Sequence, residues 1–295
     1  MQINELTDLK PRIYHMWEEN TGSMQYILVD ESTSLCAIID PVLDFDQKSC
    51  STSSASADKL MSFVSALDLS VAWIIDTHPH ADHLSAAGYL HDLTGAPTAT
   101  GEHVVEVQKI WREIYQLPEA FATDGSQWDR LLADGEILWM GDLGIEAMHS
   151  PGHTLSSISL IAGNAAFVHD TVFMPDAGTA RADFPGGDAG ALWDSIQRIL
   201  ALPDETEVYT GHDYRPGGRP AMCRSTVAEQ RTGNKHLVAC QGSKDRFVEM
   251  RTRRDKELPL PDLMLHALQV NIAGGRLPPA DCEGRSHLRL PLNAF

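Results

Sequence analysis

Short apolar runs along the chain predict its strands. Residues 24–30 and 35–42 are rich in β-branched and aromatic side chains, and the polar segment 31–34 between them indicates a hairpin. The apolar run 71–75 predicts a buried strand that ends in a polar turn. Further strands, separated by glycine-containing turns, are expected over 136–140, 144–149, 156–161, 165–169 and 208–210.

Other segments carry apolar residues at helical spacing. Leu60, Phe63, Val64 and Leu67 fall on one face of a helix predicted over 58–68. The same pattern predicts helices over 84–94, 101–116, 190–202, 226–237 and 244–256. The serine-rich segment 49–56 is expected to be a mobile loop. This order of strand-rich and helical groups predicts a layered α/β sandwich with its helices on the outside.

The pattern changes after about residue 225, where predicted helices are followed by prolines that break regular structure. A length of 295 residues fits one large domain or two small ones. We expect residues 1–225 to form the main domain and residues 226–295 to be a helical and irregular extension packed on it. The extension carries Arg251, Arg253 and Arg254, for which a solvated helix face is at least as good an interpretation as a binding role.

The chain is acidic, with 23 Lys and Arg against 41 Asp and Glu and a net charge of −18. This charge repels phosphate backbones, so nucleic acid is not expected as a partner and a nuclease is disfavoured. No apolar run is long enough to span a bilayer, and residues 1–5 lack the features of a signal peptide. We expect a cytoplasmic protein without a membrane partner, whose scattered cysteines are reduced thiols: Cys36, Cys50, Cys223, Cys240 and Cys282.

The most informative segment is 77–83, Thr-His-Pro-His-Ala-Asp-His. It follows the predicted strand 71–75, at the end of a strand where α/β sheets place their ligand sites. Four side chains that can bind a metal lie within six residues: His78, His80, Asp82 and His83. Their residue types are those of a metal site, and this interpretation is stronger than that of a solvated polar turn.

Three further residues lie at predicted strand ends. His153 is in the turn 150–154, Asp170 follows the strand 165–169, and His212 follows the strand 208–210. Each of these is a weak signal alone, because a single histidine is more often structural than a ligand. Their common position at strand ends predicts that they share one edge of the sheets with the segment 77–83.

This set of motifs resembles the metallo-β-lactamase superfamily, and the resemblance covers about residues 12–225. It implies a metallo-β-lactamase αββα sandwich with its metal site at one edge. In dinuclear members similar to glyoxalase II, the counterparts of His78, His80, His153 and Asp170 hold one metal. The counterparts of Asp82, His83 and His212 hold the other metal together with the shared Asp170.

Several segments resemble the bacterial persulfide (sulfur) dioxygenase branch more closely, among them 173–188, 211–214 and 268–272. The resemblance implies a single Fe(II) held by His78, His153 and Asp170. Two imidazoles and one carboxylate leave open positions at iron for a sulfur ligand and O₂. His80, Asp82, His83 and His212 would then orient ligands and water, although the sequence leaves open whether they hold a second metal.

The reaction that the resemblance implies converts glutathione persulfide, O₂ and water to sulfite and glutathione. Because glutathione carries two carboxylates, cations near the metal are needed. We expect Arg181 first and Tyr214 next among substrate-binding residues, and Arg231 with less support. Relatives in this branch also suggest a homo-oligomer, either a dimer or a tetramer.

Two alternatives stay open at this point. The first is a glyoxalase II-like thioesterase with two metals that acts on S-lactoylglutathione, since all the ligand positions are present. The second is a metal-binding scaffold without catalytic activity. One departure from the superfamily pattern is His169, which stands where glycine is usual; we favour simple space filling over a role beside the metal.

Overall fold

The computed structural model describes residues 11–295, which form two six-stranded sheets and a small three-stranded one. The first large sheet has the strand order β1 (Arg12–Trp17), β2 (Met24–Asp30), β3 (Leu35–Ile39), β6 (Ser70–Ile75), β8 (Thr98–Gly101) and β9 (Arg130–Leu132). The second has the order β10 (Ile137–Met140), β11 (Leu143–His149), β12 (Ile158–Ala162), β13 (Ala165–Phe167), β14 (Glu207–Tyr209) and β15 (Arg224–Thr226). The small sheet joins β5 (Ser51–Ser53), β4 (Val42–Asp46) and β7 (Leu84–Ser85).

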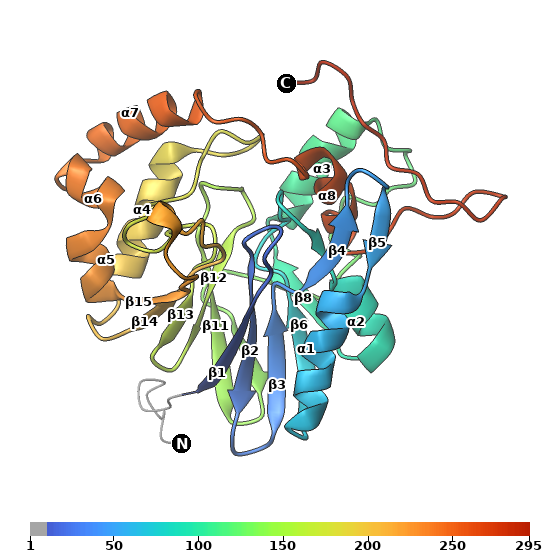
Figure 1. Cartoon of the computed structure of the whole chain (residues 1–295), viewed down its shortest axis with the longest axis horizontal. Coiled ribbons are helices and arrows are strands. Elements are labelled where there is room, and N and C mark those ends of the chain that lie inside the picture. The colour runs from blue at the N-terminus through green and yellow to red at the C-terminus, as the bar shows by residue number, and fades with distance from the viewer. Residues whose placement is uncertain (1–10) are drawn as a thin grey trace.

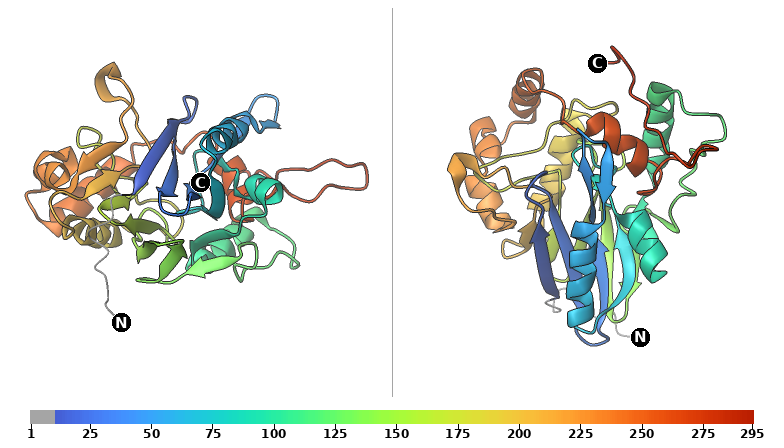
Figure 2. Two further views of the ribbon diagram at one scale, coloured as in Figure 1. Left: turned by 90° about the horizontal axis from the view of Figure 1, so that it is seen from below. Right: turned by 45° about the vertical axis from the view of Figure 1, so that its right-hand side comes forward.

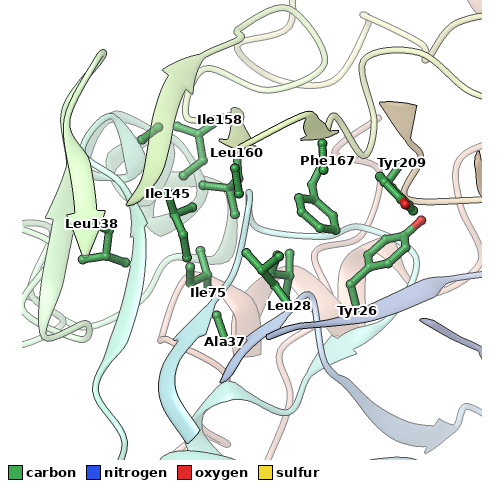
Figure 3. Packing of buried hydrophobic residues seen from close by; sticks show 14 of the residues in the cluster. Tyr26, Leu28, Ala37, Ile75, Leu138, Ile145, Ile158, Leu160, Phe167 and Tyr209 are labelled. Atoms are coloured by element: carbon green, nitrogen blue, oxygen red, sulfur yellow. The ribbon is translucent and has the colours of Figure 1, made fainter. Parts of the chain in front are cut away.

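The two large sheets pack face to face around the main core (Figure 3). Tyr26 and Leu28 of the first sheet meet Leu160 and Phe167 of the second. The strand β2 is buried along its whole length because its alternate residues, Ile27 and Val29, pack in a separate cluster on the other face. Burial of both faces of the sheet stabilises the sandwich and fixes the register of each strand.

Helices cover the outer face of each sheet (Figures 1 and 2). The first sheet is covered by α1 (Ala55–Ala66) and α2 (Ala87–Thr94), and the second by α4 (Ala189–Leu200), α5 (Val227–Gly233), α6 (Lys235–Cys240) and α7 (Lys244–Asp255). The helices α3 (Val104–Tyr115) and α8 (Met264–Asn271) pack on each other in a further cluster. The predicted αββα sandwich is therefore confirmed.

Some sequence-based expectations need correction. The segment 49–56 is not a loop throughout: β5 lies within it and pairs with β4, from Asp44 opposite Ser53 to Asp46 opposite Ser51. The helix predicted from residue 84 begins at Ala87, because Leu84 and Ser85 pair with β4 first. The strands β1, β8, β9 and β15 and the helix α8 were not predicted, since most of them are short and lack strict alternation.

The C-terminal elements are in contact with both halves of the sandwich. The helix α7 packs on α4, whereas α8 packs on β7 and α3. The division at residue 225 stays a prediction, and β15 crosses that position as the last strand of the second sheet. Within residues 11–295, no helix is long and apolar enough to cross a membrane.

Candidate metal centre and substrate cavity

The predicted ligands all lie at one edge of the sandwich, where several strands end. The segment 76–83 follows β6, His153 lies between β11 and β12, Asp170 follows β13, and His212 follows β14. The turn before His153 needs its glycine: Gly152 has φ 131°, and a Cβ there would lie 2.2 Å from the backbone nitrogen of Leu192. A side chain at this position would push the turn away from α4.

Three residues form the group best suited to one metal: His78, His153 and Asp170. Their donor atoms lie within 4.8 Å of one another. Nε2 of His78 and Oδ1 of Asp170 are buried without a hydrogen-bond partner among the described residues. Nδ1 of His153 donates to the carbonyl of Arg181 (2.9 Å), which leaves Nε2 facing Asp170 Oδ2 at 3.5 Å. Buried polar atoms without partners are costly, so this donor set fits a metal ion.

A second group lies beside the first and contains Asp82, His83 and His212. The carboxylate oxygen Oδ2 of Asp82 accepts from Ser23 Oγ (2.8 Å) and lies 2.8 Å from His83 Nδ1 and 3.3 Å from His212 Nε2. Burial opposes charge here, but His212 and His83 hold the pKa of the Asp82 carboxyl well below its usual range. Burial likewise opposes protonation of His212, yet Asp170 and Asp82 raise its pKa to about 10.

The group also retains free donor atoms. Asp82, Asp170 and His212 can converge within 4.8 Å, and Nε2 of His83 has no partner among the described residues. The hydrogen bonds within the group therefore use only some of its donor atoms, and the remaining ones could hold a second metal.

Asp40 is a site residue that the sequence analysis missed. Its Oδ1 accepts from the backbone N–H of Thr77 (2.7 Å) and lies 3.0 Å from His80 Nε2. Burial disfavours both charges, but their mutual attraction lowers the pKa of Asp40 to about 2 and raises the pKa of His80 to about 9. Asp40 follows β3, the strand paired with β6, so its place at a neighbouring strand end was the available signal.

His169 is not simple filling, contrary to our expectation. Its ring stacks on that of His78, with 4.6 Å between ring centroids. Its Nδ1 accepts from the backbone N–H of Asp170, and its Nε2 lies 2.7 Å from the carbonyl of Ile158. The backbone φ of 23° explains why glycine is the usual residue here. His169 therefore contacts two members of the three-residue group.

A cavity of about 1000 Å³ opens above this centre, with Asp82, His153 and Asp170 in its lining. The cations that line it are Lys48, Arg181, Lys235, Arg251 and Arg254. Such a concentration of cations in a chain of net charge −18 fits an anionic ligand.

Two of the three predicted substrate-binding residues line the cavity. Arg181 is held by Asp183 (2.7 and 2.8 Å) and by the carbonyl of Pro259 (2.6 Å). The Tyr214 ring stacks on His212 at the cavity wall. Arg231 is not in the lining: it lies on α5, where it pairs with Asp204 and donates to the carbonyl of Leu200.

The arginine cluster of the C-terminal extension does not form one solvated face. Arg253 is exposed, but Arg251 is only 1 % exposed and forms an ion pair with Asp255. Arg254 is exposed at the cavity together with Lys235. The helical spacing alone could not show which of these arginines turn inward.

Comparison with known proteins identifies the family to which this architecture belongs. The family model described as "Metallo-beta-lactamase superfamily" matches residues 22–212. The chain is 56% identical over 285 residues to a "Beta-lactamase hydrolase-like protein" of Xylella fastidiosa; the match covers 97% of this chain and 65% of that relative. The chain thus spans less than two thirds of the length of this relative.

Other relatives match over nearly their whole length. The chain is 45% identical to "Glyoxylase B2" of Dictyostelium discoideum, over 96% of this chain and 97% of the relative. It is 27% identical to the mitochondrial "Persulfide dioxygenase ETHE1" of Bos taurus, over 90% of this chain and 89% of that relative. The crystal structure of ETHE1 from Myxococcus xanthus superposes with a TM-score of 0.71 at 28% identity, and covers 90% of this chain and 100% of that one.

Proposed function

Because the chain belongs to the metallo-β-lactamase superfamily, we propose that it is a persulfide dioxygenase with one Fe(II) held by His78, His153 and Asp170. The reaction consumes glutathione persulfide, O₂ and water and yields glutathione, sulfite and protons. The observation that carries the proposal is the buried three-residue donor group, in which His78 Nε2 and Asp170 Oδ1 form no hydrogen bond within residues 11–295. His212 Nε2 lies 3.5 Å from Asp170 Oδ1. Bound Fe(II) would supply the activation of O₂, since a two-histidine, one-carboxylate set leaves coordination positions open.

The remaining residues of the centre would orient this set. His80 is fixed by Asp40, while His83 and His212 are fixed by Asp82. Hydrogen bonds of this kind hold an imidazole in one orientation and one tautomer. His169 adds a stacked ring against His78. Their role in this proposal is to keep the three donors in place.

The cavity walls would bind the glutathione moiety. Arg181 retains N–H groups beyond those bonded to Asp183 and Pro259, because a guanidinium has five. Lys235 and Arg254 line the same cavity and form no ion pair among the described residues. Charge-assisted hydrogen bonds from these cations would hold the two carboxylates, and Tyr214 would form part of the wall.

A second candidate function is a thioesterase of the glyoxalase II type. The second group of Asp82, His83, His212 and the shared Asp170 supports it, as does similarity to a relative named Glyoxylase B2. Two metals could then activate a water for attack on S-lactoylglutathione. This substrate carries the same glutathione carboxylates, so the cavity cations do not separate the two functions.

Metal analysis and two activity assays test the proposal. Protein purified without added metal is expected to contain one iron per chain and to consume O₂ when glutathione persulfide is added. Omission of the persulfide, and substitution of reduced glutathione, are the controls. Two metals per chain with rapid hydrolysis of S-lactoylglutathione and no O₂ uptake would establish the thioesterase instead.

A further inference from the structure

The helix α8 places a polar residue against the backbone of the histidine-rich segment. Nδ2 of Asn271 donates to the carbonyls of His80 (2.7 Å) and His83 (2.8 Å), and Oδ1 accepts from the backbone N–H of Ser85 (2.8 Å). All three hydrogen-bonding groups of this amide are thus used on one segment, 80–85. Asn271 itself is only 2 % exposed.

The amide comes from a distant part of the chain. Asn271 lies 186 to 191 residues from its partners in sequence, so the contact ties the C-terminal extension to the loop after β6. The loop is buried, and a buried carbonyl without a partner costs about 1–3 kcal/mol. The position of the loop therefore depends on α8.

The helix α8 is itself held firmly. Ala267 and Val270 pack in the apolar cluster that includes Leu84 and Leu90. The chain after the helix passes close to α2, because a Cβ on Gly88 would lie 3.0 Å from the carbonyl oxygen of Gly275. Asn271 is thus a fixed point against which the metal-binding loop is held.

The helix α7 makes a similar connection to the other side of the centre. Arg251 donates to the carbonyl of Thr179 (3.1 Å), and Asp255 accepts from the backbone N–H of Ala182 (3.0 Å). Between these two contacts lies Arg181, whose carbonyl accepts from Nδ1 of His153. The ion pair of Arg251 and Asp255 thereby fixes the acceptor that sets the tautomer of His153.

We propose that the C-terminal extension positions the metal ligands: Asn271 fixes the loop that carries His78, and the Arg251–Asp255 pair fixes the acceptor of His153. These are positioning residues, since none of them belongs to the three-residue donor group. Loss of a residue that hydrogen-bonds a metal ligand directly typically weakens metal binding about 10- to 100-fold. Asn271 and the Arg251–Asp255 pair act through the backbone beside the ligands, so we expect an effect at the lower end of this range. The inference depends on the metal centre and not on the reaction, so a lack of O₂ uptake would leave it standing.

The first test compares Asn271→Leu with Gln269→Leu. Gln269 lies on the same helix, and its amide also makes three hydrogen bonds, but these go to Leu265 and Arg289. Both substitutions remove an amide of similar role in folding. Iron release to a ferrous chelator is measured on the full-length, iron-loaded protein, with thermal unfolding of the metal-free protein as the measure of stability.

We expect Asn271→Leu to release iron about 10-fold faster, and Gln269→Leu to release it at the wild-type rate. The absorption bands of the Co²⁺-substituted protein, which report ligand geometry, should shift in Asn271→Leu alone. Equal release rates and equal Co²⁺ spectra in the two variants would overturn the proposal for Asn271, whatever their thermal stabilities.

The double variant Arg251→Met/Asp255→Leu tests the second contact and serves if Asn271→Leu does not fold. Replacing both members of a buried ion pair by apolar residues often leaves stability unchanged. The expected result is faster iron release and a shifted Co²⁺ spectrum, together with some loss of thermal stability, because the carbonyl of Thr179 and the N–H of Ala182 also lose their partners. Wild-type release and spectrum in a folded double variant would overturn the role of the pair.

Discussion

We call the metal centre beneath the cavity its floor, and the cationic residues of the lining, with Tyr214 and His236, its walls; the two are built in different ways. On the floor, His78, His80 and His83 are at most 2 % exposed, and the centre is a network of hydrogen bonds between neighbours. In the walls, Lys235 and Arg254 are exposed and have no ion-pair partner among the described residues. The side chains of the floor are therefore held in fixed orientations, whereas the walls contain cations that are available to bind an anionic ligand.

The two regions also differ in where they lie along the chain. The family match ends at residue 212 and contains every residue of the three-residue donor group. Lys235, His236 and Arg254 lie beyond it, in the C-terminal extension that also lines the cavity. Because one fold can serve different substrates through changes around its site, substrate choice is expected to depend on the walls more than on the floor.

The largest expected effect comes from breaking the floor. His78→Ala should abolish iron binding, because it removes one of three donors, and His153→Ala or Asp170→Ala should do the same. His212→Ala should retain most of the iron, because its ring bonds to Asp82 and lies outside the three-residue group. Elemental analysis of each purified variant measures the difference.

Circular dichroism of the same variants provides the control for folding. If His212→Ala loses metal as completely as His78→Ala while both stay folded, His212 belongs to the metal-binding set. A fall from two metals to one in His212→Ala would favour the dinuclear thioesterase.

A smaller effect is expected from the walls. Arg181→Met should raise KM for glutathione persulfide about 10- to 100-fold with little change in kcat, since a charge-assisted hydrogen bond contributes about 1.5–3 kcal/mol. Removal of Arg181 also leaves Asp183 without its ion-pair partner. Steady-state O₂ uptake at varied persulfide concentration separates KM from kcat.

Arg231→Met is the matched control for Arg181→Met. Arg231 makes comparable contacts, to Asp204 and to the carbonyl of Leu200, but does not line the cavity. The Arg231→Met variant should leave KM for glutathione persulfide unchanged. An equal rise of KM in both variants would show that general charge, and not a contact in the cavity, attracts the substrate.

The floor could be predicted from the sequence because its residues lie in a dense local motif and at ends of predicted strands. His78 to His83 are contiguous, and the strand ends after β11, β13 and β14 brought His153, Asp170 and His212 to the same edge. Asp40 was not predicted because a single aspartate after a strand is common. The role of Asn271 was not predicted because its partners include backbone carbonyls, which every residue type carries.

The walls could be predicted only in part. Tyr214 lies two residues after His212, and Arg181 lies in the segment that follows Asp170, so their place in the cavity could be expected from their place in the sequence. Arg251 and Arg254 depend on how α7 rotates about its axis against α4, which the weakly amphipathic sequence of α7 does not specify. Tertiary packing therefore decides which arginine is buried and which faces the ligand.

The smallest predicted effect concerns the pH dependence of stability and isolates one wall residue, His236. Burial first, and then Arg251, Arg254 and Lys235, lower the pKa of His236 to about 3, and its Nδ1 accepts from the backbone N–H of Thr179. In the unfolded chain its pKa is about 6.5, so below that pH the unfolded state takes up a proton that the folded state refuses. The wild type should therefore lose stability as the pH falls from 6.5 toward 3.

His236→Gln keeps an acceptor and removes this titration. From pH 7 to pH 5, the free energy of unfolding should fall by about 1–2 kcal/mol less in the variant than in the wild type, because each pH unit corresponds to about 1.4 kcal/mol. Urea unfolding at both pH values measures the difference, and other titrating groups cancel in the comparison. Parallel losses in the two proteins would mean that His236 takes up its proton in the folded state, and the cationic wall would then be better solvated than its burial indicates.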